Sequence, residues 1–533
     1  MTTPVVAGVA VGGSLLVILS VFATADWLRL SSIRHLASEA AATAALAAAK
    51  SLGAANAAAL AAAQAVVGGT EIVVTTERGE ARPGPSGLVF TAGPGEVTRV
   101  TVSTTGRSLL GTPVGLGQRT ITATAMAMRS GVAALTERTT AVPELPAVPA
   151  AIEARLFGSA GALTVGERAM LGQVVFRVAD LVAALGRTLS TRDDGSDVNA
   201  AAVAVASFKP SELLSALAAL YRGGARSSAE AAGIVDIIER LANAGTPDET
   251  ALPFAGLISL GGSDADLALA APLRPLEFIQ AVMRARLAQG AVTLELKSPV
   301  TSIDSVALTL ESEGTAAAVL IGGEDGVVGI PGIRISARFT IGGLAIAGAG
   351  TLELPLEAIL SSGDARIRRI ACGQVGAEVT VTGRPVRASV ALAEATASPA
   401  GASDYVRLLT ADGLTAWGKG RSSFADDPPV ELVFRPGAGD TVASLRTPID
   451  FSNRLERLAA EAQVLVSLEG RARDVMSEGG VRDEIARLIV GSVPSVDEVL
   501  SSVFATFGIV PGKMDVVAAG AACNSATLLG EVN

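Results

Sequence analysis

VVAGVAVGGSLLVILSVFATA, residues Val5–Ala25, is an uninterrupted apolar stretch without a charged side chain. A helix rises about 1.5 Å per residue and the hydrocarbon core of a bilayer is about 30 Å thick, so about 20 such residues span it. Trp27 follows directly, and indole rings favour the membrane–water interface. The stretch therefore predicts a transmembrane anchor over residues 1–25, with the lipid bilayer as a partner and Trp27 at the membrane interface.

Two features beside this stretch leave alternatives open. Ala23-Thr24-Ala25 has the small-x-small pattern of a signal-peptidase site, but Met1–Pro4 lacks the basic residue that a signal peptide carries before its apolar region. We therefore favour a retained anchor over a cleaved signal. Arg29 and Arg34 follow the span, and the positive-inside rule taken alone would leave the body of the protein in the cytoplasm.

The next segment is rich in alanine. Between Ala37 and Val67, 18 of 31 residues are Ala, the strongest helix former, and Gly53 is the only breaker. This composition predicts one long stem helix from Asp26 to Val67, ended by Gly68-Gly69. Four β-like runs follow, separated by clusters of Pro and Gly that are typical of turns. The order of parts over residues 26–140 is that of a pilin: a stem helix and then a small antiparallel sheet. The four runs are Glu71–Thr76, Gly87–Thr91, Val97–Thr104 and Arg119–Met128.

The remaining chain predicts an α+β body. Three prolines mark residues 141–151 as a semi-stiff linker. Helical periodicity dominates residues 152–290, and a period of two dominates residues 291–450, most clearly at Ile333–Ile341. Residues 451–533 predict further helices and a final strand. The terminal elements are expected at Arg454–Ser467, Val481–Val490, Val496–Phe507 and Met514–Ala518.

Composition excludes several functions. The chain has 533 residues, a net charge of -10 and 3% aromatic residues, so it is a poor partner for nucleic acid. His35 is the only histidine, and no phosphate-binding loop or Gly-x-Ser-x-Gly motif is present. We therefore expect no enzymatic activity, no cofactor and no metal site. Three acidic clusters could in principle hold calcium but are more typical of solvated turns. They are Asp193/Asp194/Asp197, Asp264/Asp266 and Asp426/Asp427.

Two further sets of residues invite a functional interpretation. Cys372 and Cys523 are the only cysteines, and they would either pair in an oxidising compartment or remain as two buried thiols. Arg366 and Arg368 are expected on one face of a strand, with Arg369 on the other. That strand face is either simply solvated or a docking patch for an acidic partner.

With these parts in hand, the sequence resembles the TadE/TadG-like group of tight-adherence (Flp) pilus-assembly proteins, with a TadG-like C-terminal region. The resemblance is carried by the apolar span and by four later stretches. These are SEAAATAALAAAKSLGAANAAALAAA (38–63), RTITATAMAM (119–128), ARIRRIACG (365–373) and KMDVVAAGAACNSATLLG (513–530).

The resemblance implies a single-pass inner-membrane protein whose body lies in the periplasm and works with other pilus-assembly or pilin-like proteins. It also implies no catalytic activity and a disulfide between Cys372 and Cys523, which match the two cysteine positions of the group. The Asp-x-Ser-x-Ser metal motif of some longer members is absent, so metal-dependent adhesion is not implied. The alternatives are a periplasmic lipid- or glycan-binding module, although the few aromatics argue against sugar stacking, and, third, a hydrolase.

Overall fold

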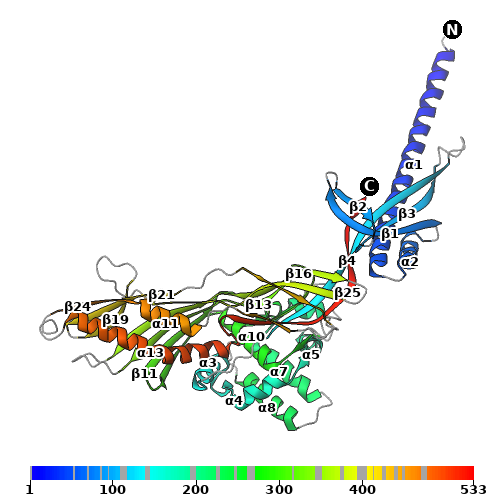
Figure 1. Cartoon of the computed structure of the whole chain (residues 1–533). Coiled ribbons are helices and arrows are strands. Elements are labelled where there is room, and N and C mark those ends of the chain that lie inside the picture. Colours follow the sequence, from blue (N-terminus) through cyan, green and yellow to red (C-terminus); the bar gives the residue numbers. More distant parts are fainter. Residues whose placement is uncertain are drawn as a thin grey trace. The chain divides into compact units, whose positions relative to one another are not determined.

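The computed structural model divides the chain into two compact units. The stem unit contains Met1–Gly131, Cys372–Val375 and Ala522–Asn533, and the body unit contains Val132–Ala371 and Gly376–Ala521. The structure describes residues 3–51, 54–68, 71–84, 87–93, 95–108, 117–138, 145–192, 200–223, 229–244, 249–260, 271–314, 317–342, 351–372, 377–392, 405–411, 413–422, 428–436, 442–446, 451–469 and 477–532, with the side chains of α1 from residue 20 onward. Both units mix helices with antiparallel sheet, as the sequence predicts (Figure 1).

Two helices form the stem where one was expected. Helix α1 spans Thr3–Lys50 and α2 spans Ala55–Val67, and the two pack against each other. The interruption falls beside Gly53, which has a low helix propensity and is the only breaker in this stretch. Nine buried alanines, all at most 4% exposed, line the contact between the helices and the sheet, where small side chains allow close approach. They are Ala37, Ala40, Ala41, Ala44, Ala45, Ala48, Ala49, Ala59 and Ala63.

Four antiparallel strands complete the stem unit. Their order is β2-β1-β3-β4, and the central register pairs Val100 with Ala125. Alternation of Val and Ala along β3 and β4 turns one face of the sheet toward α1, as a half-buried sheet requires. The strands extend further than the predicted runs because the hydrogen-bonded ladder continues past their apolar centres. They are β1 (Ile72–Gly84), β2 (Gly87–Ala92), β3 (Val97–Arg107) and β4 (Gln118–Arg138).

The body unit begins with a group of short helices around a shared apolar core. Helix α3 (Ala147–Phe157) starts inside the predicted linker, because Pro149 lies in its first turn, where a missing N–H costs nothing. The stretch from Val165 to Arg192 holds two helices separated by the short strand β5 (Phe176–Arg177). The other helices are α4 (Val165–Gln173), α5 (Val178–Arg192), α6 (Ala200–Val205), α7 (Pro210–Gly223), α8 (Ala229–Asn243) and α10 (Pro275–Leu287).

Three antiparallel sheets make up most of the remaining body. A six-stranded sheet has the order β10-β11-β14-β15-β18-β21, a four-stranded sheet β13-β16-β17-β22 and a three-stranded sheet β19-β20-β24. Strand β14 has the bounds predicted from its period of two. The strands are β10 (Val292–Val300), β11 (Ile303–Ser312), β14 (Ile333–Ile341), β15 (Leu352–Leu360), β18 (Ala388–Leu392), β21 (Arg421–Ser422), β13 (Val327–Ile330), β16 (Gly363–Cys372), β17 (Ala377–Arg384), β22 (Val430–Phe434), β19 (Val406–Ala411), β20 (Leu414–Lys419) and β24 (Gln463–Leu468).

Short strands complete the network. Strand β12 pairs with β4 on one side and with β8 on the other, and β25 pairs with β23 and β4. Beyond these, β5 pairs with β9, and β6 with β7. These strands are β6 (Ser207–Phe208), β7 (Leu252–Pro253), β8 (Ile258–Leu260), β9 (Pro272–Leu273), β12 (Val319–Gly322), β23 (Val442–Arg446) and β25 (Lys513–Val532).

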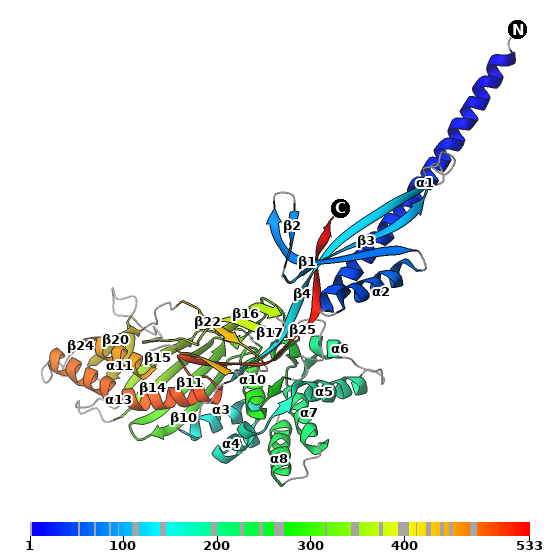
Figure 2. The same cartoon turned by 45° about the vertical axis from the view of Figure 1, so that its right-hand side comes forward.

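Two late helices lie alongside the six- and three-stranded sheets (Figure 2). Helix α11 spans Phe451–Glu461, and β24 occupies the rest of the expected helix. Helix α13 spans Glu478–Thr506 as a single helix that includes Pro494, where two helices were expected. Among the residues that the structure describes with their side chains, α13 is the one helix that is long and apolar enough to span a membrane. However, 56% of its most apolar 18-residue segment is buried. It is therefore a core helix of the body unit.

Candidate functional site

The exposed face of α1 carries Trp27, the residue that the sequence predicts at a membrane interface. Trp27 is 67% exposed, and Val21 and Leu28 are also exposed. These side chains project from a helix that continues without a break from the apolar stretch Val5–Ala25 into the buried alanines. A long helix with large apolar side chains unpacked in the isolated chain presents a surface that lipid or another subunit would cover.

One end of β3 fixes the level at which α1 leaves the stem unit's sheet. The Asp26 carboxylate, only 7% exposed, accepts a hydrogen bond of 2.7 Å from the Ser108 hydroxyl just beyond that strand. Gly106 lies so close to Leu30 and Ile33 that an added Cβ would lie 3.2 and 3.4 Å from their side chains. No role for Asp26 was predicted from the sequence, where its only signal is a lone carboxylate directly after an uncharged span.

Cys372 and Cys523 lie together in the stem unit and form a disulfide. Their Sγ atoms are 2.01 Å apart and their Cα atoms 5.7 Å apart. Arg129 supports the same place, because its Nε donates a hydrogen bond of 2.6 Å to the Cys523 carbonyl. The disulfide thus joins the end of β16 to β25 and holds the last segment of the chain in the stem unit.

Buried ion pairs in the body unit link distant helices and strands. Arg284 on α10 contacts Glu137 at 3.1 Å and donates to the Phe507 carbonyl at 2.7 Å. Glu153 on α3 contacts Arg168 at 2.5 Å and accepts from the Leu163 amide at 2.8 Å. Burial raises the pKa of Glu153 to about 7, against the opposing charge of Arg168. Each of these two carboxylates has a positive partner, so the pairs link the elements that carry them.

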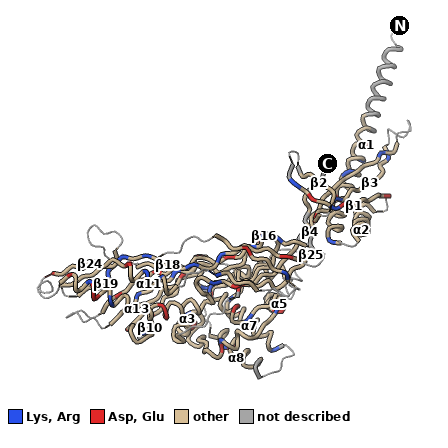
Figure 3. Tube along the Cα trace, in the orientation of Figure 1, with Lys and Arg blue, Asp and Glu red and all other residues tan. Residues whose placement is uncertain are grey.

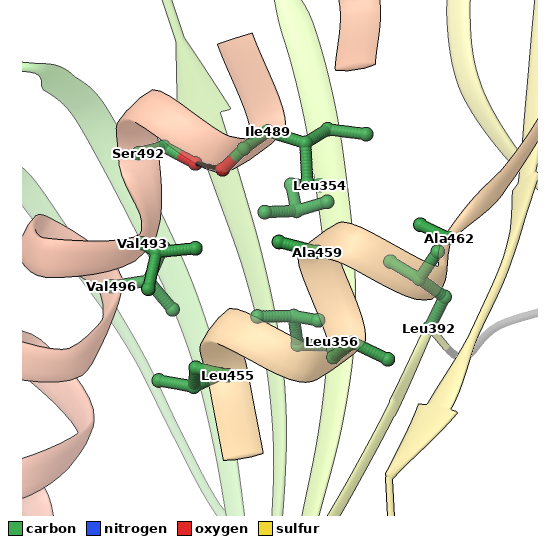
Figure 4. A pocket seen from close by; sticks show the side chains of 11 residues that line it. Leu354, Leu356, Leu392, Leu455, Ala459, Ala462, Ile489, Ser492, Val493 and Val496 are labelled. Atoms are coloured by element: carbon green, nitrogen blue, oxygen red, sulfur yellow. Dashed lines mark hydrogen bonds between the residues drawn. The ribbon is translucent and has the colours of Figure 1, made fainter. Parts of the chain in front are cut away.

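One small pocket opens between α11, α13 and strands β15 and β18 (Figure 4). It encloses about 290 Å³, including its open mouth. The lining is aliphatic apart from Ser492, whose hydroxyl already donates to the Ile489 carbonyl at 2.8 Å. No titratable group among its described lining residues faces the space, so acid–base chemistry has no basis there. The lining residues are Leu354, Leu356, Leu392, Leu455, Leu458, Ala459, Ala462, Ile489, Ser492, Val493 and Val496.

The other residues singled out from the sequence include the single histidine and the three acidic clusters. His35 is exposed on α1, and among the described residues no group of three His, Cys, Asp or Glu could hold a metal ion. The acidic clusters at 193–197, 264–266 and 426–427 lie outside the described residues. Along the described part of the body unit, acidic and basic residues are interspersed (Figure 3).

The arginines of β16 are all exposed, including Arg369, which was expected on the opposite face. The burial pattern changes phase between Ile367 and Ile370, where the Glu324 carboxylate accepts from the Ile370 amide at 3.3 Å. Arg368 donates to the Thr382 hydroxyl at 3.1 Å, within its own sheet.

The strands on the two sides of the turn at 322–326 belong to different sheets. Strand β12 pairs with β4, whereas β13 pairs with β16. Asp325 in this turn has a φ of 67°, a backbone conformation that glycine and short polar residues tolerate best.

Comparison of the chain with protein-family models, with curated proteins and with solved structures gives no match.

Proposed function

We propose that this protein is a non-enzymatic, membrane-anchored envelope protein associated with the assembly of a tight-adherence (Flp-type) pilus. Helix α1 would cross the inner membrane through Val5–Ala25, and both units would lie in the periplasm. The observation that carries the proposal is the continuity of α1 from the uncharged stretch to the alanines packed under the small sheet. This arrangement is that of a pilin, in which one helix is both anchor and stem.

Two further observations support the proposal. The disulfide between Cys372 and Cys523 suits an oxidising compartment, which for an inner-membrane protein is the periplasm. The exposed apolar residues of α1, Trp27 among them, suit a helix that packs beside lipid and other helical subunits. Small side chains would then let neighbouring helices approach closely.

Membrane insertion is tested by fractionation of the full-length protein. We expect the wild type to remain in the membrane after alkaline carbonate and to need detergent for release. Leu16→Arg combined with Ile18→Arg should shift it to the soluble fraction, because each buried arginine costs about 2.5–3.5 kcal/mol at the centre of a span. Val205→Arg, at a position 86% exposed on the body unit, is the matched control and should leave the distribution unchanged.

Topology and partnership need separate measurements. A reporter enzyme that is active only in the periplasm, fused after Asn533, should be active, and a cytoplasmic reporter at the same place should be silent. The opposite pattern would contradict the proposed orientation. Photo-crosslinkers placed at Trp27 and Leu28 should capture pilin-like subunits, whereas one at Val205 should not. Neighbouring genes for a secretion ATPase and a prepilin peptidase would support the pilus role directly.

A further inference from the structure

The few aromatic residues with polar groups are not scattered evenly over the fold. The chain has two Trp and two Tyr, and one of each lies on the solvent side of the three-stranded sheet β19-β20-β24. Along β20, Leu414, Ala416 and Gly418 are buried, whereas Trp417 and Lys419 are partly exposed. Trp417 therefore belongs to the outer face of this sheet.

We propose that this outer face is a binding site for an acidic glycan, in which a sugar ring stacks on Trp417 and the sugar carboxylates pair with Arg407 and Lys419. The proposal is independent of the pilus role. It also revises the expectation, drawn from the overall aromatic content, that sugar stacking is disfavoured, because local arrangement matters more than the average.

Strand register places the six residues of the site in two rows. Trp417 pairs with Arg407 of β19 on one side and with Leu465 of β24 on the other. One step along the same face, Lys419 pairs with Gln463, and its Nζ lies 5.9 Å from the centre of the Tyr405 ring. The Tyr405 hydroxyl donates to the Gln463 side chain at 2.9 Å, across β20. Side chains on directly opposed strand positions lie about 5 Å apart, so each row is a continuous surface.

The exposed part of Trp417 is of the kind that stacks on sugars. Its indole Nε1 is shielded from solvent and has no hydrogen-bond partner among the described residues. The side-chain area that Trp417 presents to solvent is therefore carbon. Flat aromatic carbon pairs with the C–H groups on the face of a pyranose ring, and the exposed Leu465 beside it extends the apolar strip.

The charge of the face contrasts with that of the molecule. The whole chain carries -10, yet this face presents Arg407 and Lys419, and the described residues that share it include no acid. Arg407 is exposed and has no ion-pair partner among the described residues. Among the described residues no carboxylate competes with an anionic ligand for the Arg407 guanidinium next to the indole.

The spacing of these charges favours a glycan over a nucleic acid. Nucleic acids present one phosphate per nucleotide, and their binding depends on many basic contacts. Two cations provide few such contacts, whereas a short chain of uronic acids also offers C–H faces that stack on an indole ring. The site is also held rigid from behind, because Leu408, Ala416 and Leu468 pack into the core of the body unit.

Fluorescence of the full-length protein in detergent tests the proposal. The variant Trp27→Phe leaves Trp417 as the only tryptophan, so its emission reports on the site alone. We expect oligogalacturonate to change this emission in a saturable way, and matched neutral galactose oligomers to bind about tenfold more weakly. Raising the salt concentration should weaken the binding of the acidic oligomer.

Two variants in the Trp27→Phe background separate stacking from charge. Trp417→Ala in this background has no tryptophan left to fluoresce, whereas Arg407→Gln keeps Trp417. Binding to both variants is therefore measured by calorimetry, so that the two can be compared. Trp417→Ala should weaken oligogalacturonate binding about tenfold or more, as removal of a central aromatic contact does. Arg407→Gln should weaken it severalfold and reduce its salt dependence, whereas Arg155→Gln, an exposed arginine on α3, should change neither. Thermal unfolding confirms that each variant is folded.

Three outcomes would overturn the proposal. One is the absence of saturable binding of oligogalacturonate up to millimolar concentration. Another is equal affinity for acidic and neutral oligomers, with Arg407→Gln binding like the parent. The third is tighter binding of a single-stranded oligonucleotide or of an acidic peptide than of the acidic sugar, which would assign the face to that class of ligand. Membrane location and pilus assembly do not enter this assay, so its failure would leave the proposed function intact.

Discussion

Glu153 shows how burial makes one carboxyl group sensitive to pH. It lies on α3 against Arg168 and accepts the Leu163 amide, with 1% of its surface exposed. Its folded pKa of about 7 lies above the ordinary value of 4.5, because desolvation outweighs the attraction of Arg168. The folded state therefore holds this proton more tightly than the unfolded state does.

The free energy of unfolding of the body unit should accordingly fall as pH rises from about 4.5 to about 7, by on the order of 3 kcal/mol from this residue. Below that window the contribution is fully present, and above it the contribution is lost. Glu153→Gln should flatten this part of the profile in denaturant unfolding at a series of pH values, even if it lowers stability throughout. An unchanged slope in Glu153→Gln, equal to that of the exposed control Glu456→Gln, would contradict the assignment.

The disulfide makes a second prediction at the residue scale. It closes a loop between positions 151 residues apart, for which the loop-entropy relation gives about 4–5 kcal/mol, often less when measured. We expect no thiol to react with an alkylating reagent until reductant is added. Cys372→Ser and Cys523→Ser should each lower the unfolding temperature by the same amount as the double variant, because either one breaks the same bond. Two freely reactive thiols in the native protein would rule out the pairing.

At the scale of single elements, the alanine contact between α1, α2 and the small sheet is the one that tolerates larger side chains least. Ala63 on α2 is fully buried, whereas Ala61 on the same helix is exposed. Ala63→Leu should destabilise the stem unit by about 1–3 kcal/mol, because a close-packed site has no room for the added carbons. Ala61→Leu is the matched control, with an expected change within about 0.5 kcal/mol.

Hydrogen exchange of the amides in α2 and β1 measures this effect locally. Faster exchange should appear in Ala63→Leu and not in Ala61→Leu. Equal protection in the two variants would mean that the helices do not pack through their alanines in solution.

Hydrophobic periodicity predicts a helix or strand well where contacts with other elements do not change the local secondary structure. Strand β14 follows from the strict alternation of Ile333–Ile341, and α8 from its helical spacing. Tertiary context decides the remainder. Residues 463–467 closely follow helix α11 in the sequence but pair with β20. This pairing cannot be predicted from the local sequence pattern. Pro494 suggests a helix end, yet burial of Val496 and Val499 on one side and Ile489 on the other holds α13 together as one helix.

The candidate sites divide in the same way. The disulfide between the two cysteines was predicted from the sequence and is present, whereas the anchor stays a prediction from the charge-free length of residues 5–25. Asp26 against Ser108, and Trp417 between Arg407 and Leu465, join positions whose neighbourhood depends on strand pairing. No strand was predicted at Leu414–Lys419 beyond the general period of two over residues 291–450, and the partners of Trp417 on each side follow only from the strand register.

At the scale of the whole molecule, the stem unit is discontinuous in sequence. The chain passes between the units four times, between residues 131 and 132, 371 and 372, 375 and 376, and 521 and 522. Six consecutive segments were predicted, and none of them included a return to the first unit. Both the first and the last described residues belong to the stem unit, so the body unit is an insertion within it.

This insertion determines the order in which the parts of the stem unit are synthesised. The ribosome delivers Cys372 151 residues before Cys523, and the part of β25 that returns to the stem unit is translated after the whole body unit. Until Cys523 is made, the stem unit lacks its last strand and Cys372 has no partner thiol, while the body unit can already complete its own core. A product truncated before residue 523 would therefore keep an unpaired thiol at Cys372.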